Sequence, residues 1–162
     1  MMENSSNDYL AMENEELIMS ITDSILDEIQ QLSSDEELEN LAVQKFYVLV
    51  ASNFDMEMQN GGLCQFFMNS GHVYVPMLAD ALQTVGASQH AHLFLSFCKE
   101  NNIDPSNIED FGNVSIENYL ALLEKYPFNQ FDEQYFKLEQ DEGLFSTLVA
   151  YVRNNLSLLL PG

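Results

Sequence analysis

Apolar residues recur at helical spacing along almost the whole chain, and this periodicity is the feature that most restricts the fold. In residues 8–32 the apolar positions fall on one arc of a helical wheel, and no alternating run of strand length stands out along the chain. The periodicity predicts an all-α fold, a single compact domain of about seven or eight helices. The expected helices cover residues 8–32, 34 to about 59, 63–69, 75–85, 88–98, 116–125, 132–139 and 142–156.

Local signals mark where several of these helices begin and end. Ser34 followed by Glu37 is a capping box, and Ser88 is an expected N-cap. Helix ends are expected at Gly61-Gly62, Ser70-Gly71 and Gly86. Residues 1–7 are polar and are expected to form a disordered tail, whereas residues 8–162 are expected to form one helical domain.

The charge of the chain is strongly unbalanced. Against 26 Asp and Glu residues stand 5 Lys and Arg residues, which gives a formal net charge of −21 and a pI near 4.1. Direct binding to nucleic acid or to an anionic membrane surface is not expected, because affinity for phosphate comes mainly from Lys and Arg. The charge suggests a basic protein partner, and the alternative is an acidic surface that serves solvation alone.

The acidic residues are concentrated at one end of the chain. Residues 1–44 carry twelve of them and no Lys or Arg, and the first cation is Lys45. The predicted partner-binding residues come from the first helix and the start of the second: Glu13, Glu16, Asp23, Asp27, Asp35, Glu36, Glu37 and Glu39.

Helical geometry turns part of this set into a stripe. Glu13, Glu16, Asp23 and Asp27 share one flank of the first helix, away from its apolar arc. They span roughly 21 Å, a mean of about 7 Å between charges, at about 1.5 Å per residue. That spacing is of the same order as phosphate spacing along a nucleic-acid strand, where the rise is about 3.4 Å. The alternative is a solvated face, and acids in a first helical turn are favoured by the helix dipole alone.

Catalytic and metal-binding patterns are absent from the sequence. There is no P-loop, no C-x-x-C, no H-E-x-x-H and no G-x-S-x-G. His90 and His92 are two apart and face different sides of a helix, as do the neighbouring acids of Asp55/Glu57 and of Asp132/Glu133. We therefore expect no enzyme activity, no cofactor and no metal.

The remaining composition favours a cytoplasmic protein. Cys64 and Cys98 lie among apolar residues and are expected to be buried, reduced thiols. The apolar stretch Leu156–Leu160 is far shorter than the roughly 20 residues of a membrane helix. The N-terminus has neither the basic segment nor the apolar run of a signal peptide.

One short segment carries a distinctive pattern. Residues 58–71 read M-Q-N-G-G-L-C-Q-F-F-M-N-S-G, in which two glycines predict a tight helix connection. Gln65 and Asn69 lie four apart on one helix face and need hydrogen-bond partners, which we expect in the loop backbone around Asn60. The alternative is a small polar pocket at these three residues.

This segment resembles the signature of a bacterial family of helical domains of unknown function, typified by a DNA-mimic protein. The signature N-G-G-x-x-Q-F-F-x-N corresponds to Asn60, Gly61, Gly62, Gln65, Phe66, Phe67 and Asn69. Further similarity lies at 81–87, 131–136 and 151–155, and the resemblance covers about residues 38–155. It implies an acidic, cytoplasmic, all-helical domain in which the signature residues determine the fold. The family's typifying member is understood to occupy the DNA-binding surface of basic regulators or nucleoid proteins.

The leading hypothesis is a DNA-mimic protein that binds a basic DNA-binding protein in competition with DNA. One alternative is an acidic helical domain with an accessory or immunity-type role, whose charge serves solubility only. Another is a small-ligand module with a pocket near Asn60, Gln65 and Asn69. A homodimer is compatible with the sequence, since it would extend the charged surface.

Overall fold

The computed structural model describes residues 6–108, 111 and 114–161, and for residues 70–72 it describes the backbone alone. This part of the chain contains helices and no strands, which confirms the predicted all-α fold. The helices are α1 (Ser6–Ala11), α2 (Asn14–Gln31), α3 (Asp35–Asn40), α4 (Val43–Asn60), α5 (Gly62–Val85), α6 (Ser88–Glu100), α7 (Ile116–Lys125), α8 (Phe128–Glu139), α9 (Leu144–Asn154) and α10 (Leu156–Leu159).

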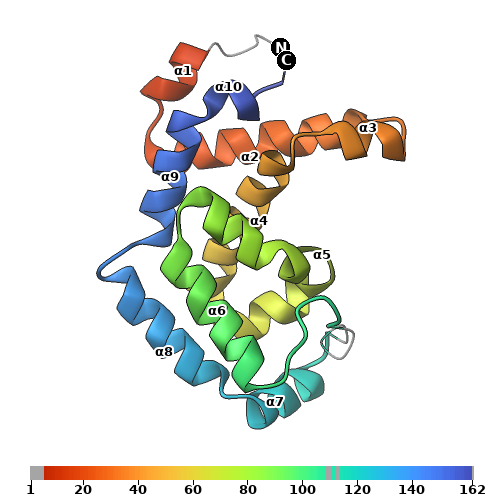
Figure 1. Ribbon diagram of the computed structural model, residues 1–162, viewed down its shortest axis with the longest axis vertical. Coiled ribbons are helices and arrows are strands. Elements are labelled where there is room, and N and C mark those ends of the chain that lie inside the picture. Colours follow the sequence, from red (N-terminus) through yellow and green to blue (C-terminus); the bar gives the residue numbers. More distant parts are fainter. Residues whose placement is uncertain (1–5, 109–110, 112–113, 162) are drawn as a thin grey trace.

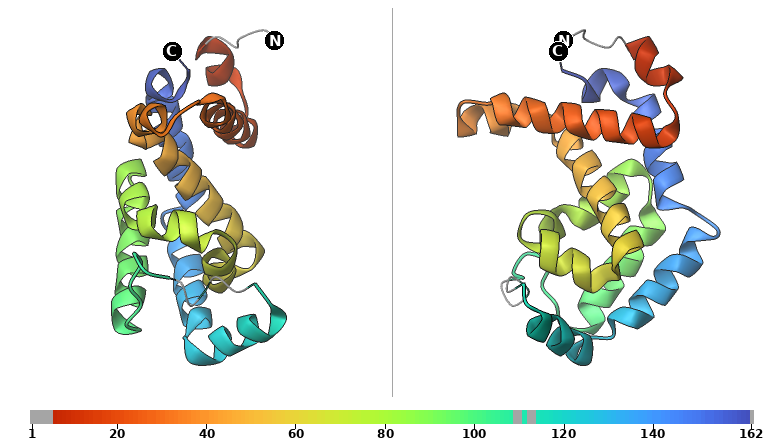
Figure 2. Two further views of the ribbon diagram at one scale, coloured as in Figure 1. Left: turned by 90° about the vertical axis from the view of Figure 1, so that its right-hand side faces the viewer. Right: turned by 180° about the vertical axis from the view of Figure 1, so that it is seen from behind.

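The long helices α4 and α5 form the centre of the molecule. Helices α6 and α8 pack on α5, and α7 covers the end of α5 that lies lowest in Figure 1. At the other end, α2 crosses α4, and α9 returns the chain to the same end (Figures 1 and 2). The N-terminal and C-terminal helices, α1 and α10, therefore lie near one another, although Ala11 and Leu156 are 145 positions apart in the sequence.

Aromatic side chains fill the core between these helices. The ring of Phe54 on α4 makes edge contacts with Phe66 on α5 and Tyr135 on α8, at centroid distances of 5.0 and 5.7 Å. The ring of Phe67 makes tilted contacts with Phe94 and Phe128, at centroid distances of 6.2 and 6.0 Å. Such pairs add about 0.5–1.5 kcal/mol each beyond the area that they bury.

The expected helix over residues 8–32 is wrong, because the chain breaks between α1 and α2. The guanidinium of Arg153 on α9 donates to the backbone oxygens of Leu10 and Met12, at 2.9 and 2.8 Å. These bonds hold the chain at the break, where Glu13 has an extended backbone. Of the expected disordered tail, residues 1–5 lie outside the described part, and Ser6 and Asn7 form the first turn of α1.

The expected helix from Ser34 to about residue 59 is also divided, at Leu41 and Ala42. Its first part, α3, has no buried residue, whereas α4 buries a full stripe that includes Val48, Ala51 and Phe54. The break lets α4 turn into the core while α3 stays in solvent. The predicted N-cap is confirmed, because Ser34 Oγ accepts from the N–H of Glu37. The return bond of the capping box is shifted by one residue: the Glu37 carboxylate accepts from the N–H of Ser33, not of Ser34.

The expected helix end at Ser70-Gly71 is wrong, because α5 continues through it and through Pro76. Proline removes one helical hydrogen bond and costs about 3 kcal/mol in a helix interior. On both sides of this point α5 presents fully buried side chains, such as Phe67 and Leu78. Each contributes about 1.5–3 kcal/mol of burial, which offsets the cost. The expected end at Gly86 is confirmed, since Gly86 caps α5 with φ +95°.

Three further boundaries differ from those expected. Helix α8 begins at Phe128 rather than Asp132, because Pro127 serves as its N-cap and Phe128 is buried. The last segment divides into α9 and α10 at Asn155. The N-cap of α6 is Ala87 rather than Ser88, whose hydroxyl donates to Gln83 instead.

Candidate protein-interaction surface

Helices α2 and α3 form an acidic arm, defined here as residues 13–40. It carries ten Asp and Glu residues and no Lys or Arg. The arm extends to one side of the helical body (Figures 1 and 2). It packs on the body through Leu17, Ile21 and Ile25, and the residues beyond Ile25 in α2 and α3 include none that is buried. Its far end therefore projects into solvent.

The acidic residues named from the sequence all lie on this arm, and all are exposed. Glu13 is the N-cap residue of α2. Glu16, Asp23 and Asp27 lie on the face of α2 opposite Leu17 and Ile21, as the helical wheel indicates. The residues at the far end are Asp35, Glu36 and Glu37 in the first turn of α3, and Glu39 near its end. Glu15 is a further exposed acid, which the sequence interpretation left out of the set.

The tenth acid of the arm has a different role. Glu28 forms an ion pair with Lys45 of α4, and Lys45 is only 5% exposed. Among the ion pairs found in the described residues, this is the one that involves the arm. Glu28 is absent from the predicted set, and the structure places it on the inner side of the arm. The sequence feature that could have pointed to Lys45 as the partner of an arm acid is its position as the first cation after twelve acidic residues.

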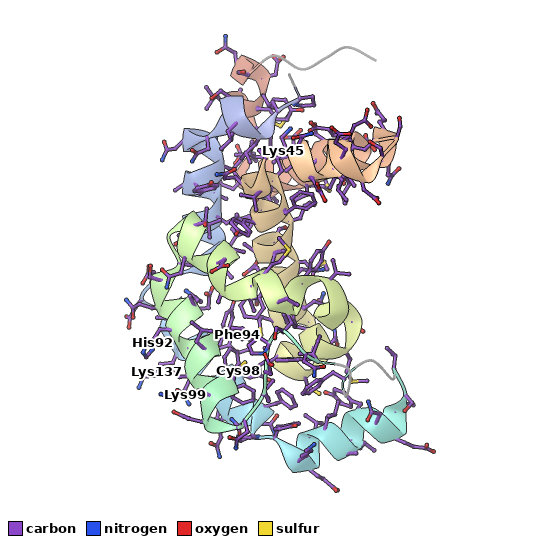
Figure 3. The ribbon with its side chains drawn as sticks, turned by 45° about the vertical axis from the view of Figure 1, so that its right-hand side comes forward. Lys45, His92, Phe94, Cys98, Lys99 and Lys137 are labelled. Atoms are coloured by element: carbon purple, nitrogen blue, oxygen red, sulfur yellow. The ribbon has the colours of Figure 1, made fainter. Side chains whose placement is uncertain are left out.

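The other cations also leave the outer face of the arm uncompensated. Arg153 donates to backbone oxygens and to Asn14 Oδ1. Lys99, Lys125 and Lys137 belong to the last turns of α6, α7 and α8. Figure 3 shows Lys99 and Lys137 well away from Lys45 and α2. Like charges along one helix repel, so the arm maintains a strong negative field at a cost in stability.

The signature residues meet a buried carboxylate that the sequence interpretation missed. Glu57 on α4 is 6% exposed and accepts from Gln65 Nε2 at 2.7 Å and from Asn69 Nδ2 at 3.3 Å. The prediction that these amides bond to the loop backbone around Asn60 is therefore wrong. The amides turn to Glu57 because a buried carboxylate needs donors more than an exposed loop does. Glu57 precedes Gln65 by 8 residues and Asn69 by 12, so a short sequence motif does not include all three residues.

Both glycines of the signature lie where a neighbouring side chain comes too close to the backbone to leave room for a Cβ atom. A Cβ on Gly61 would lie 2.0 Å from Gln65 Oε1, inside the side chain that reaches Glu57. Gly62 has φ +79°, and a Cβ there would lie 2.2 Å from Asp132 Oδ2. Phe66 and Phe67 are buried, and Asn60 is exposed.

An open groove of about 670 Å³ runs beside the signature. Its lining residues are Gln65, Met68, Asn69, Val114, Ser115, Ile116 and Tyr119. The predicted pocket residues Gln65 and Asn69 line it, and Asn60 does not. The groove lies between α5 and the start of α7, including the two residues before α7, on a different part of the molecule from the acidic arm.

A second polar cluster lies inside the helical body. The Tyr135 hydroxyl donates to Asp55 Oδ1 at 3.3 Å, and His90 Nε2 lies 2.7 Å from Glu139 Oε1. Burial, and then the charge of Glu139, raises the pKa of Asp55. Burial, reinforced by both carboxylates, raises the pKa of Tyr135. Sequence reasoning missed this cluster because its members come from three separate helices.

Within the described residues, no group of three His, Cys, Asp or Glu side chains is suited to hold a metal ion. His90 is buried and His92 is exposed, so the two imidazoles do not converge. Cys64 and Cys98 are free and buried, and burial raises the pKa of their thiols to about 11 and about 12. Among the helices described, none has the length and apolarity needed to cross a membrane.

Comparison with known proteins identifies the family. Curated proteins and solved structures gave no match to the chain. Residues 39–155 match the family described as DMP19-like protein, which agrees with the span of the resemblance seen in the sequence. That match covers well over half of the chain, from the end of α3 to the start of the turn after α9. The chain therefore belongs to the DMP19-like protein family.

Proposed function

We propose that this chain is a non-enzymatic interaction protein that binds a basic DNA-binding protein in competition with DNA. The observation that carries the proposal is the acidic arm: nine of its ten carboxylates are exposed, on helices that project from the body. Membership of the DMP19-like family is compatible with this role.

The length of the arm matches the surface with which a DNA-binding protein contacts duplex DNA. An 18-residue helix such as α2 is about 27 Å long at 1.5 Å per residue, roughly eight base-pair steps of B-DNA. Carboxylates along it would pair with the Lys and Arg side chains that otherwise contact phosphates. Because this pairing releases counterions and steers encounter, binding should be fast and strongly dependent on salt.

The test compares two charge-matched variants of the full chain. The arm variant carries Glu16→Lys, Asp23→Lys, Asp27→Lys and Glu36→Lys. The control variant carries Glu100→Lys, Glu124→Lys, Glu133→Lys and Asp141→Lys, which are exposed acids outside the arm. Both variants change the net charge by the same amount.

Each variant and the wild-type chain is used to capture proteins from a bacterial lysate. Mimicry predicts that the wild type and the control variant retain a DNA-binding protein that duplex DNA displaces, whereas the arm variant loses it. If the two variants behave alike, the charge serves solubility only and the proposal is wrong.

The groove beside the signature favours a second candidate function, the binding of a small ligand. Its wall combines the side-chain amides of Gln65 and Asn69 with the apolar Met68 and Ile116. Ligand binding there predicts shifts in the amide resonances of α5 and α7 when a compound library is added. Shifts confined to the acidic arm on adding a basic protein would favour mimicry instead.

A further inference from the structure

Two cations lie at the junction between the acidic arm and the helical body. Lys45 binds Glu28 of α2 and also lies 3.5 Å from the backbone oxygen of Leu160, which follows α10. Arg153 holds the entry to α2 through Leu10, Met12 and Asn14. The two residues therefore contact α2 near opposite ends.

Neither cation is placed to neutralise the outer face. Lys45 is 5% exposed, and a lysine is almost never so buried unless a partner holds it. Arg153 bonds to neutral oxygens in every contact found within the described residues. Both side chains thus fix the arm in place, and neither pairs with a carboxylate of its outer face.

The far half of the arm has little else to hold it. Past Ile25, the apolar residues Ile29 and Leu32 are only partly buried, and α3 is exposed throughout. The Glu28–Lys45 pair lies in this weakly packed stretch.

We propose that Lys45 is a positioning residue, which holds the acidic arm at the angle that a DNA-binding protein reads, with Arg153 as the second anchor. This inference rests on the proposed function and identifies what sets the geometry of its site. It also separates position from charge, since removing Lys45 makes the net charge of the chain more negative and leaves Glu28 unpaired, while it loosens the arm.

The test is Lys45→Met in the full chain. Charge alone predicts tighter binding to a basic protein, because the net charge becomes more negative by one. Positioning predicts the opposite, and in a specific way: the association rate constant is unchanged or slightly higher, and the dissociation rate constant rises about tenfold. A variant that had merely lost folded protein would lower the apparent association rate instead.

Two matched variants control for the fold. Lys45→Arg keeps the cation and should restore slow dissociation. The double variant Glu28→Leu/Lys45→Met keeps the net charge, and it should restore binding because an apolar pair can replace a buried ion pair. Hydrogen exchange should show faster exchange at residues 26–40 in Lys45→Met alone, with α5 and α6 unchanged.

The probes are polylysine, which reads charge but no fixed geometry, and the DNA-displaced protein captured by the wild-type chain. Polylysine should bind Lys45→Met at least as tightly as wild type. Unchanged or slower dissociation of the captured protein from Lys45→Met would overturn the positioning role, even if the arm exchanges faster. The proposed function fails separately: if the arm variant keeps the captured protein, or if none is displaced by DNA, the arm is not the site and both claims fall.

Discussion

The carboxylate of Asp132 on α8 accepts a hydrogen bond from the backbone N–H of Leu63, at 3.0 Å, in the first turn of α5. The two residues are 69 positions apart, and their bond joins the glycine connection of the signature to a helix from the other half of the chain. The unpaired N–H groups at a helix start favour such a carboxylate. Gly62 has no side chain at the point where this carboxylate approaches.

Gly62→Ala should destabilise the protein more than Gly86→Ala. Both glycines have left-handed backbones, which cost another residue about 1–2 kcal/mol. A Cβ on Gly86 would meet Thr147 at an ordinary 3.5 Å, whereas one on Gly62 would displace Asp132. Losing that charged hydrogen bond adds about 1.5–3 kcal/mol. Urea unfolding of both variants measures the difference, and equal losses would show that Asp132 is not constrained.

Gln65→Leu should destabilise the protein by about 1–3 kcal/mol, because it leaves the buried Glu57 with only the longer bonds to Asn69. The double variant Glu57→Leu/Gln65→Leu removes the carboxylate as well and should recover part of the loss. A double-mutant cycle from urea unfolding checks this, with an expected coupling of about 1–3 kcal/mol. If the losses of unfolding free energy in the two single variants simply add in the double variant, Glu57 and Gln65 contribute to stability independently.

The contribution of Asp55 to the free energy of unfolding should decrease as the pH rises. Burial raises its pKa above 3.8, so the folded state binds a proton more tightly than the unfolded state does. The stability that protonated Asp55 contributes is therefore present at acid pH and is lost as the pH rises through its raised pKa. Asp55→Asn, which still accepts from Tyr135, should remove this loss. The check is the stability difference between variant and wild type from pH 4 to pH 7, which should grow with pH; a flat difference would contradict it.

The fold class could be predicted from the sequence because helical periodicity depends only on which residues are apolar. Helix ends that depend on local chemistry, at Gly86 and at the Ser34 N-cap, were also correct. The breaks at Met12 and at Leu41 were missed because distant partners determine them: Arg153 bonds the first, and the path of α4 into the core requires the second.

The arm acids were identifiable because exposure follows from the helical wheel of α2 alone. The ion pair between Glu28 and Lys45 could not be predicted in this way, because it depends on where α2 crosses α4. The same reason hid Glu57, whose burial depends on how α4 and α5 fold back on each other at Gly61.

The stability of the chain should rise with salt. Exposed carboxylates on the arm repel each other, and about 0.5 M NaCl shortens the Debye length to roughly 4 Å, which screens them. The arm variant, with four of these acids changed to Lys, should be more stable than wild type at low salt and should gain less from added NaCl. Thermal unfolding at low and high NaCl checks this, and an equal gain in both proteins would show that the arm does not repel itself.

The most direct measurement of the central claim is a competition titration with the captured DNA-binding protein. Labelled wild-type chain is bound to that protein, and duplex DNA is added at low and at moderate salt. The account predicts full displacement, an apparent Kd for the chain that rises in proportion to the DNA added, and weaker binding at the higher salt. A ternary complex of chain, protein and DNA, or a Kd that DNA leaves unchanged, would contradict it.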